Sequence, residues 1–363
     1  MLIRKAVLIF TLAAGLIVFP RDSNAQESPR APWRFLASGD SRNCGDVVMP
    51  GIAELARKDQ VVFYWHLGDL RAIYNFDEDI QHQPEHLAKP LTIAEYETIA
   101  WPDFIERQIV PFGSIPFYLG IGNHETIAPA KAREDFILQF ADWLDMPALR
   151  AQRLKDDPKD YLVKTYFHWI DRGISFYYID NVTAEELDAA QLRWFERNLA
   201  KDLADPSVLT IVAGMHKALP ESISAGHSMN ESPMGTESGR RVYADLLRAR
   251  DEAHKHVYVL ASHSHYFMDG IFNTDYWKQH GGVLPGWIVG TAGAVRYALP
   301  PNSGDARKAV TNAYGSLLGT VQPNGEITFE FEQLQEKDVP ESVTARYGQD
   351  FVHWCFVENT QVK

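Results

Sequence analysis

Six side chains with metal-binding chemistry follow short apolar runs in this sequence. Two are carboxylates, one is a neutral amide and three are imidazoles: Asp40, Asp69, Asn123, His216, His263 and His265. A mixed set of carboxylates and imidazoles suits zinc, manganese or iron better than calcium. A carboxylate can also bridge two ions, and such a pair can hold a nucleophile and a phosphate together. The residue types therefore predict a transition-metal centre, and phosphate is one group that such a centre can hold.

The apolar runs before these residues predict buried strands that end in tight turns. They cover residues 33–38, 61–67, 117–121, 208–214 and 256–261. Helical patterns lie between some of them, at 48–59, 183–203 and 239–253. Strands that alternate with helices indicate a layered α/β fold, in which ligands gather beyond the carboxyl ends of the strands. All the candidate ligands lie at such ends.

The rest of the chain predicts further strands and two loop insertions. Residues 166–178 and 287–299 look like more strands, and residues 315–334 suggest a hairpin turned at Pro323-Asn324-Gly325. Segments near 75–115 and 220–238 have weaker periodicity. We expect both segments to border the site and to influence its specificity.

The order of the motifs resembles the calcineurin-like metallophosphoesterase superfamily, which includes purple acid phosphatases, nucleotidases and phosphodiesterases. The motifs fall within roughly residues 33–300 and are Gly39-Asp40, Gly68-Asp69, Gly122-Asn123-His124-Glu125, His216 and His263-Ser264-His265. Gly-Asn-His-Glu after a strand is specific, and a later His-x-His reinforces it. The resemblance implies a four-layer α/β/β/α sandwich, with two central mixed sheets flanked by helices. It also suggests an exported bacterial protein somewhat similar to purple acid phosphatases.

The resemblance also implies a role for each candidate ligand. Asp69 would bridge two divalent or trivalent metal ions, and the expected elements are Fe, Mn or Zn. Asn123, His216 and His263 would complete the sphere of one ion, and the other ligands named above, Asp40 and His265, would serve the second. His124 would be the catalytic histidine that neutralises charge or protonates the leaving oxygen. The implied reaction is hydrolysis of a phosphoester, with metal-bound hydroxide attacking phosphorus in line with the leaving group.

Three positions depart from the family pattern. Arg42 stands where the first motif usually has histidine, and a guanidinium cannot replace an imidazole ligand. Ala72 stands where the second motif usually has Asp or Tyr, and Tyr74 is a possible displaced metal ligand. Ser262 replaces the usual glycine of the last motif. We therefore expect the second ion to bind weakly. The sequence leaves open whether Arg42 grips a substrate phosphate or forms a structural ion pair.

The residues near these motifs carry further expectations. His227 lies in the loop after His216 and is a candidate substrate contact, whereas Lys217 is expected to be solvated and Glu125 to support the ligands. An alternative function is a non-catalytic or regulatory protein that binds a phosphate ligand on a degenerate scaffold. The missing histidine of the first motif supports that alternative, and retention of Asn123 and the other motifs argues against it.

Residues 1–25 resemble a signal peptide. A basic start at Arg4 and Lys5 precedes an apolar stretch, and Ser23-Asn24-Ala25 offers small residues for cleavage. We expect residues 26–363 to form a single domain in a periplasmic or secreted protein without a stable membrane anchor. A retained N-terminal anchor is the alternative reading. The sequence does not indicate an oligomeric state.

Net charge and cysteine content limit which binding partners and which cellular compartment we expect. The chain has a net charge of −13, which disfavours binding to a nucleic acid duplex and leaves a small phosphoester as the expected partner. Only Cys44 and Cys355 are present, so a thiolate zinc site is not expected. Export would allow these two cysteines to form a disulfide, and two unpaired thiols are the equal alternative.

Overall fold

The structure is a computed structural model that describes residues 31–127, 131–182 and 187–362. Residues Ala31–Lys363 form one compact unit. The predicted signal peptide, residues 1–25, lies outside the described residues, as do residues 183–186 at the start of one predicted helix. No helix in the described ranges combines the length and apolar character needed to cross a bilayer.

Five strands form the first sheet, in the order β12-β11-β1-β2-β3. Their bounds are β1 Trp33–Ser38, β2 Tyr64–His66, β3 Phe117–Leu119, β11 Tyr314–Val321 and β12 Ile327–Leu334. β1, β2 and β3 are parallel, whereas β11 runs antiparallel to both β1 and β12. The first three predicted strands therefore end at the same edge of one sheet.

Seven strands form the second sheet, in the order β10-β8-β9-β7-β6-β5-β4. Their bounds are β4 Phe167–Asp171, β5 Ile174–Ile179, β6 Thr210–Met215, β7 His256–Ala261, β8 Phe267–Asp269, β9 Gly286–Val289 and β10 Lys308–Val310. β5, β6, β7 and β9 are parallel, and β4, β8 and β10 are antiparallel to their neighbours. The ends of β6 and β7 therefore also lie together.

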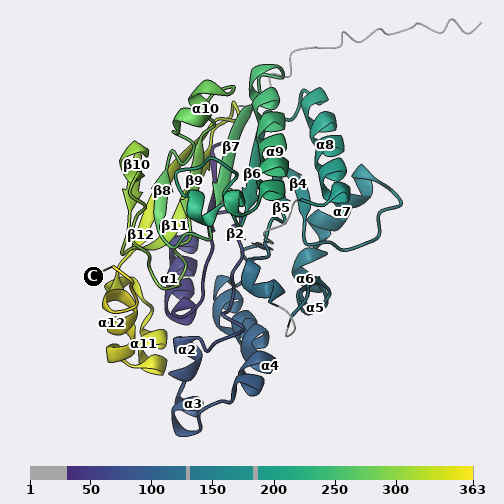
Figure 1. Cartoon of the computed structure of the whole chain (residues 1–363). Coiled ribbons are helices and arrows are strands. Elements are labelled where there is room, and N and C mark those ends of the chain that lie inside the picture. The colour runs from purple at the N-terminus through teal and green to yellow at the C-terminus, as the bar shows by residue number, and fades with distance from the viewer. Residues whose placement is uncertain (1–30, 128–130, 183–186, 363) are drawn as a thin grey trace, which may run out of the picture. The chain divides into compact units, whose positions relative to one another are not determined.

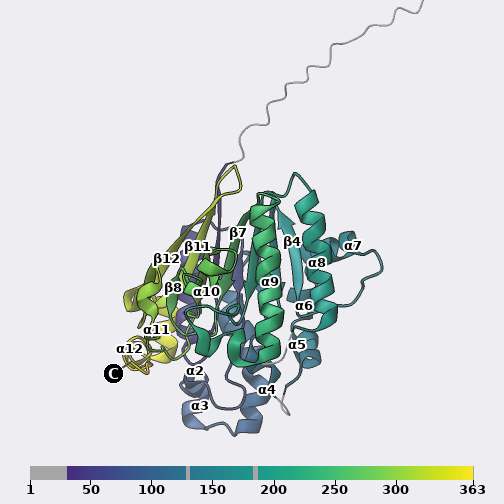
Figure 2. The same cartoon turned by 45° about the horizontal axis from the view of Figure 1, so that its top comes forward.

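Alternate residues of the second sheet belong to two different hydrophobic cores. In β5, Phe176 and Tyr178 are buried in the core that they share with the first sheet. Tyr177 and Ile179 are buried in the second core, against helices α8 (Ala189–Ala204) and α9 (Pro233–Asp251). Because neighbouring side chains of a strand point to opposite faces, the sheets pack on one another and helices cover the outer face. Figures 1 and 2 show α8 and α9 side by side along that face.

The helices form the outer layers and the insertions. Their bounds are α1 Gly45–Lys58, α2 Glu78–Gln81, α3 Pro84–Ala88, α4 Ile93–Phe104, α5 Arg133–Gln139, α6 Ala141–Leu144, α7 Pro147–Asp156, α8 Ala189–Ala204, α9 Pro233–Asp251, α10 Asp275–Gln279, α11 Glu341–Tyr347 and α12 Gln349–Val357. Residues of α1 pack in the core of the first sheet. The predicted α/β architecture, with two mixed sheets flanked by helices, is confirmed.

The structure has strands in both of the further predicted segments, with other bounds. Residues 166–178 form two antiparallel strands, β4 and β5, because Arg172 and Gly173 make a turn with positive φ angles of 50° and 86°. The predicted strand at 287–299 ends at Val289. Beyond it, the backbone amide of Ala292 donates to Gly39 O at 3.0 Å, so this apolar segment lines a turn of the first sheet.

The predicted hairpin at 315–334 is confirmed as β11 and β12, with Gly325 at a φ of 86° in the turn. The segment near 75–115 contains α2, α3 and α4, and these helices lie at one end of the sandwich in both views (Figures 1 and 2). Cys44 and Cys355 form a disulfide, which settles the alternative that the sequence left open. The bond joins the residue before α1 to α12.

Candidate metal centre

In each sheet, a backbone hydrogen bond joins the ends of two neighbouring strands. The amide of Asp40 donates to Gly68 O at 2.9 Å, and the amide of Ser262 donates to His216 O at 2.9 Å. Across the sandwich, the Ser262 hydroxyl donates to Leu67 O at 2.8 Å. The serine that replaces the family glycine thus ties the last motif to the second one.

Three candidate ligands occupy strained turns. The φ angles of Asp40, Asp69 and His263 are 61°, 60° and 67°, in the left-handed region that non-glycine residues seldom adopt. Such a conformation costs about 1–3 kcal/mol for each residue and persists only where surrounding contacts impose it. These turns therefore lower the stability of the fold, and they direct the three side chains inward.

Glycine is required where two of these turns meet. Gly68 has a φ of 96°, and a Cβ added there would lie 2.6 Å from the backbone nitrogen of Gly122. A Cβ on Gly122 would lie 2.1 Å from the backbone nitrogen of Asp69. A side chain at either position would push the second and third motifs apart.

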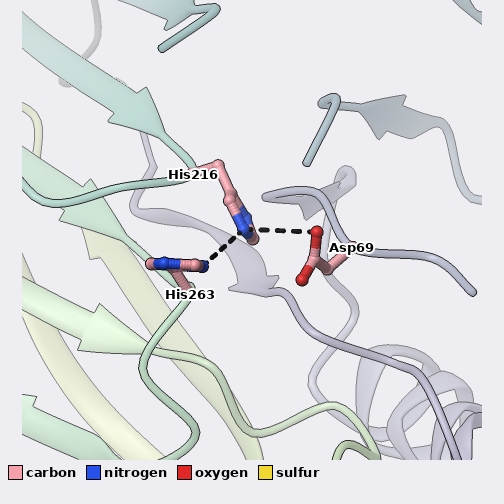
Figure 3. Close-up of side chains that lie close together, drawn as sticks. All are labelled: Asp69, His216 and His263. Atoms are coloured by element: carbon pink, nitrogen blue, oxygen red, sulfur yellow. Dashed lines mark hydrogen bonds and ion pairs between the residues drawn. The ribbon is translucent and has the colours of Figure 1, made fainter. Parts of the chain in front are cut away.

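Four side-chain atoms that could bind a metal ion converge on one point. They belong to Asp69, Asn123, His216 and His263, which we call the first ligand group. His216 Nε2 lies 2.9 Å from Asn123 Oδ1, 3.1 Å from His263 Nδ1 and 3.3 Å from Asp69 Oδ1. Figure 3 shows the His216 imidazole between the Asp69 carboxylate and the His263 ring. A tetrahedral zinc ion with bonds of about 2.1 Å would separate its ligand atoms by about 3.4 Å, close to this spacing.

His216 has a fixed orientation in this group. Its Nδ1 lies 3.0 Å from Leu67 O, a carbonyl that can only accept, so Nδ1 carries a hydrogen and Nε2 faces the ligands. Burial alone would lower the pKa of His216, but the Asp69 and Asp40 carboxylates raise it to about 9. The field of these carboxylates thus favours a cation at this point.

Asp40, Asp69 and His265 form the second ligand group. His265 Nε2 lies 3.2 Å from Asp40 Oδ1, and donor atoms of the three residues lie within 4.8 Å of one another. This group also contains Arg42, whose Nη2 lies 3.1 Å from His265 Nε2 and whose Nε lies 3.7 Å from Asp69 Oδ2. Arg42 is 7% exposed, so its contacts are internal to the site.

Both groups contain side chains of the types that bind metal ions. Among the described residues, Asp40 Oδ1 and Asp69 Oδ2 are buried carboxylate oxygens without a hydrogen-bond partner, an expensive arrangement unless a cation compensates them. Burial alone would raise the pKa of Asp69, yet His216 and His124 hold it well below its ordinary value. The pKa of Asp40 is likewise lowered, with His265 opposing the effect of burial. Buried aspartates and histidines could therefore hold metal ions here.

Glu125 supports the turns that carry the ligands, as expected from the sequence. Its carboxylate accepts hydrogen bonds from the amides of Gly122 at 2.7 Å, Leu70 at 2.9 Å and Asp69 at 3.0 Å. Burial and the nearby Asp69 raise the pKa of Glu125 to about 8. Glu125 therefore supports the ligand turns, in the way that residues around a metal sphere commonly do.

His124 lies beside both ligand groups. Its amide donates to Asp69 Oδ1 at 3.0 Å, and its Nδ1 lies 2.8 Å from Ala72 O, which fixes the hydrogen on Nδ1. Nε2 then accepts from Arg42 Nη1 at 2.6 Å. Burial lowers the pKa of His124, and the charge of Arg42 lowers it further against the opposing Asp69. Tyr74 is 58% exposed and stacks on the His124 ring at 5.1 Å.

His227 lies at the rim of the site. Its ring is 5.4 Å from that of His263 and 5.6 Å from that of Tyr297, which in turn stacks on His265 at 4.0 Å. His227 and Tyr297 line a cavity of about 670 Å³. Sequence reasoning missed Tyr297, because its segment was taken for a strand.

The expectation that Lys217 is solvated was wrong. Its side chain is 5% exposed and pairs with Glu231, whose carboxylate also lies 3.8 Å from His263 Nε2. The nearby His263 imidazole and the ion pair with Lys217 lower the pKa of Glu231 to about 2. Sequence reasoning did not single out Glu231, and only its place in the segment near 220–238 could have suggested it.

Solved structures of two phosphatases and of PhoD have a similar fold. A purple acid phosphatase from yellow lupin (Lupinus luteus) seeds is 15% identical, with a TM-score of 0.54, over 84% of this chain and 52% of that one. This chain thus spans about half the length of the lupin protein. PhoD is 14% identical, with a TM-score of 0.51, over 91% of this chain and 77% of its own. A dimetal phosphatase from Danio rerio is 10% identical, with a TM-score of 0.50, over 83% and 98%. No protein of curated function matches this chain in sequence.

The sequence profile described as calcineurin-like phosphoesterase matches residues 39–267, more than half of the chain. The match includes the turns of Asp40, Asp69 and Asn123 and the histidines of both later motifs. The chain belongs to the calcineurin-like phosphoesterase family.

Proposed function

We propose that this protein is a metal-dependent hydrolase of small phosphoesters. The observation that carries the proposal is the convergence of Asp69, Asn123 and His263 on His216 Nε2, at 2.9–3.3 Å. Membership of a family described as phosphoesterases agrees with this chemistry. A bound Zn, Mn or Fe ion would supply Lewis acidity, which polarises phosphoryl oxygens and lowers the pKa of water.

The residues beside the ligands would bind and orient the phosphoryl group. Arg42 offers a permanently charged guanidinium, whose forked N–H groups match phosphate oxygens. Because burial and Arg42 lower its pKa, His124 is neutral at pH 7 and accepts at Nε2. We therefore assign the fixed positive charge at this face to Arg42, and to His124 a role in orienting Arg42 and exchanging a proton at Nε2.

The organic part of the substrate would occupy the neighbouring cavity of about 670 Å³. Its lining includes His227, Tyr266, Tyr297 and Pro300, which offer flat apolar surfaces with a few polar groups. The stack of Tyr297 on His265 joins this cavity to the second ligand group. Its size suits a small ester, and the acidic net charge of −13 argues against a nucleic acid duplex as substrate.

We place the protein in the periplasm or outside the cell. The disulfide between Cys44 and Cys355 fits an oxidising compartment, and the basic and apolar start of the sequence fits export. Detection of the mature protein in a periplasmic or culture fraction would test this placement, and exclusive recovery from the cytoplasm would contradict it.

One observation favours a second function, the non-catalytic binding of a phosphate ligand. Arg42 contacts His265 and His124 within the site, where it could bind phosphate without cleaving it. Assays with p-nitrophenyl phosphate and bis-p-nitrophenyl phosphate, each with Mn, Fe or Zn and with chelator, separate the two functions. Metal-dependent turnover that falls at least a hundredfold in His124→Ala, and is retained in the exposed control His280→Ala, supports the hydrolase. Phosphate binding without turnover supports the alternative.

A further inference from the structure

The Arg42 guanidinium lies within the second ligand group rather than at its rim. Its Nη2 is 3.1 Å from His265 Nε2, and its Nε is 3.7 Å from Asp69 Oδ2. Burial disfavours the charge of Arg42, but the Asp69 and Asp40 carboxylates raise its pKa above the ordinary value. A permanent positive charge therefore already lies beside the three residues that would bind a second metal ion.

Two imidazoles direct their lone pairs to this guanidinium. His265 Nδ1 lies 2.7 Å from Val295 O, and His124 Nδ1 lies 2.8 Å from Ala72 O. Because a carbonyl only accepts, each Nδ1 carries a hydrogen, and in the neutral ring Nε2 has the lone pair. Arg42 donates to both Nε2 atoms, at 3.1 Å and 2.6 Å. A metal ion bound to His265 would need the lone pair that Arg42 uses.

The two oxygens of Asp69 face different sides: one faces the first ligand group, and the other faces the Arg42 guanidinium. Oδ1 is 3.3 Å from His216 Nε2, in the first ligand group. Oδ2 is 3.7 Å from Arg42 Nε, in the second. The carboxylate expected to bridge two metal ions thus lies between the first ligand group and a guanidinium. In the described part of the chain, the His216 imidazole at the centre of the first group contacts no arginine.

We infer that this protein binds one metal ion, at Asp69, Asn123, His216 and His263, and that the Arg42 guanidinium replaces the second ion at Asp40, Asp69 and His265. The inference rests on the proposed function, because it assigns the charges of the proposed metal centre. A second ion would be repelled by the guanidinium and would have to displace it from His265. The guanidinium keeps a positive charge at this position and offers N–H groups to a phosphate oxygen.

The test is the number of manganese ions for each chain. The full-length protein and its variants are loaded with Mn²⁺, freed of excess metal and measured by elemental analysis and electron paramagnetic resonance. We expect one isolated Mn²⁺ in the wild type and in Arg42→Lys, which keeps the charge. Arg42→Ala and Arg42→His should bind two ions that are magnetically coupled. Arg307→Ala removes an exposed arginine that pairs with Asp269 and should leave the count at one.

Two coupled ions in the wild type would overturn the inference, as would a count that stays at one in correctly folded Arg42→Ala and Arg42→His. Circular dichroism checks the fold of each variant, and the wild-type count decides the claim even where a variant unfolds. Phosphoester hydrolysis is measured separately on the same samples. One ion without hydrolysis would support the inference and contradict the proposed function, whereas the absence of bound metal would contradict both.

Discussion

The candidate ligands are positioned by backbone strain and by close contact between turns. Asp40, Asp69 and His263 have positive φ angles, and Gly68 and Gly122 leave room for the turns to meet. The motifs predicted which residues would gather at the site. They could not predict that Arg42 contacts His124 and His265, because that contact depends on how the two sheets pack.

Replacement of Gly122 by alanine should weaken metal binding at least tenfold. The new Cβ would lie 2.1 Å from the backbone nitrogen of Asp69 and would displace its carboxylate from the first ligand group. Isothermal titration of metal-free protein with Mn²⁺ measures the affinity. Gly304→Ala is the matched control, since its Cβ would meet nothing within 4 Å. Equal affinity in Gly122→Ala and the control would show that this contact does not position Asp69.

A buried cluster of charged residues around Arg71, which we call the Arg71 cluster, connects the insertion helices to the sandwich. Arg71 pairs with Asp46 of α1 at 2.6 Å, with Asp79 of α2 at 2.9 Å and with Asp103 of α4. Tyr347 of α11 donates to Asp46 at 2.7 Å. The sequence showed the segment near 75–115 as a separate insertion. Its attachment was not predictable, because the cluster gathers residues from four helices and a loop.

Arg71→Met should lower the free energy of unfolding by about 3–5 kcal/mol at pH 7. The substitution leaves buried carboxylates of Asp46, Asp79 and Asp103 without their shared cation. Urea denaturation measures the change. Arg57→Met is the control, because Arg57 pairs with Glu54 at the surface and its loss should cost less than about 1 kcal/mol. Equal losses in the two variants would contradict a central role for Arg71.

The Arg71 cluster should also make stability depend on pH. Burial and the nearby Asp46 raise the pKa of Asp103 from 3.8 to about 7, so the folded protein holds a proton that the unfolded chain releases. This contribution is fully present below pH 3.8 and is lost as the pH rises through 7. Relative to Asp103→Asn, the wild type should therefore lose up to about 1.4 kcal/mol for each pH unit across this window. Denaturation curves at pH 5, 6, 7 and 8 test it, and parallel profiles would refute the assignment.

At the scale of the whole molecule, the alternation of strands and helices predicted a layered α/β fold, and the resemblance carried by the strand-end motifs implied the two-sheet sandwich. The sequence failed where tertiary contacts decide the outcome. The continuous apolar pattern at 166–178 concealed a turn at Arg172 and Gly173, and the burial of Lys217 depends on Glu231. The pairing of Cys44 with Cys355 was equally undecided, since it joins residues near the two ends of the compact unit.

Reduction of this disulfide should destabilise the protein by about 2–5 kcal/mol, because the crosslink limits the unfolded chain across a separation of 311 residues. Thermal denaturation with and without dithiothreitol measures the effect. The double variant Cys44→Ser/Cys355→Ser should match the reduced wild type and should not respond to dithiothreitol. A wild-type melting temperature that is unchanged by complete reduction would contradict this prediction.

The most direct test of the account is whether phosphoester hydrolysis follows metal bound to the first ligand group. Bis-p-nitrophenyl phosphate and p-nitrophenyl phosphate hydrolysis is measured in purified protein, after chelation and after return of Mn, Fe or Zn. We predict that chelation abolishes turnover, that one of these metals restores it, and that His216→Ala cannot be restored. Turnover that survives complete metal removal, or metal-loaded protein that cleaves neither ester, would contradict the account.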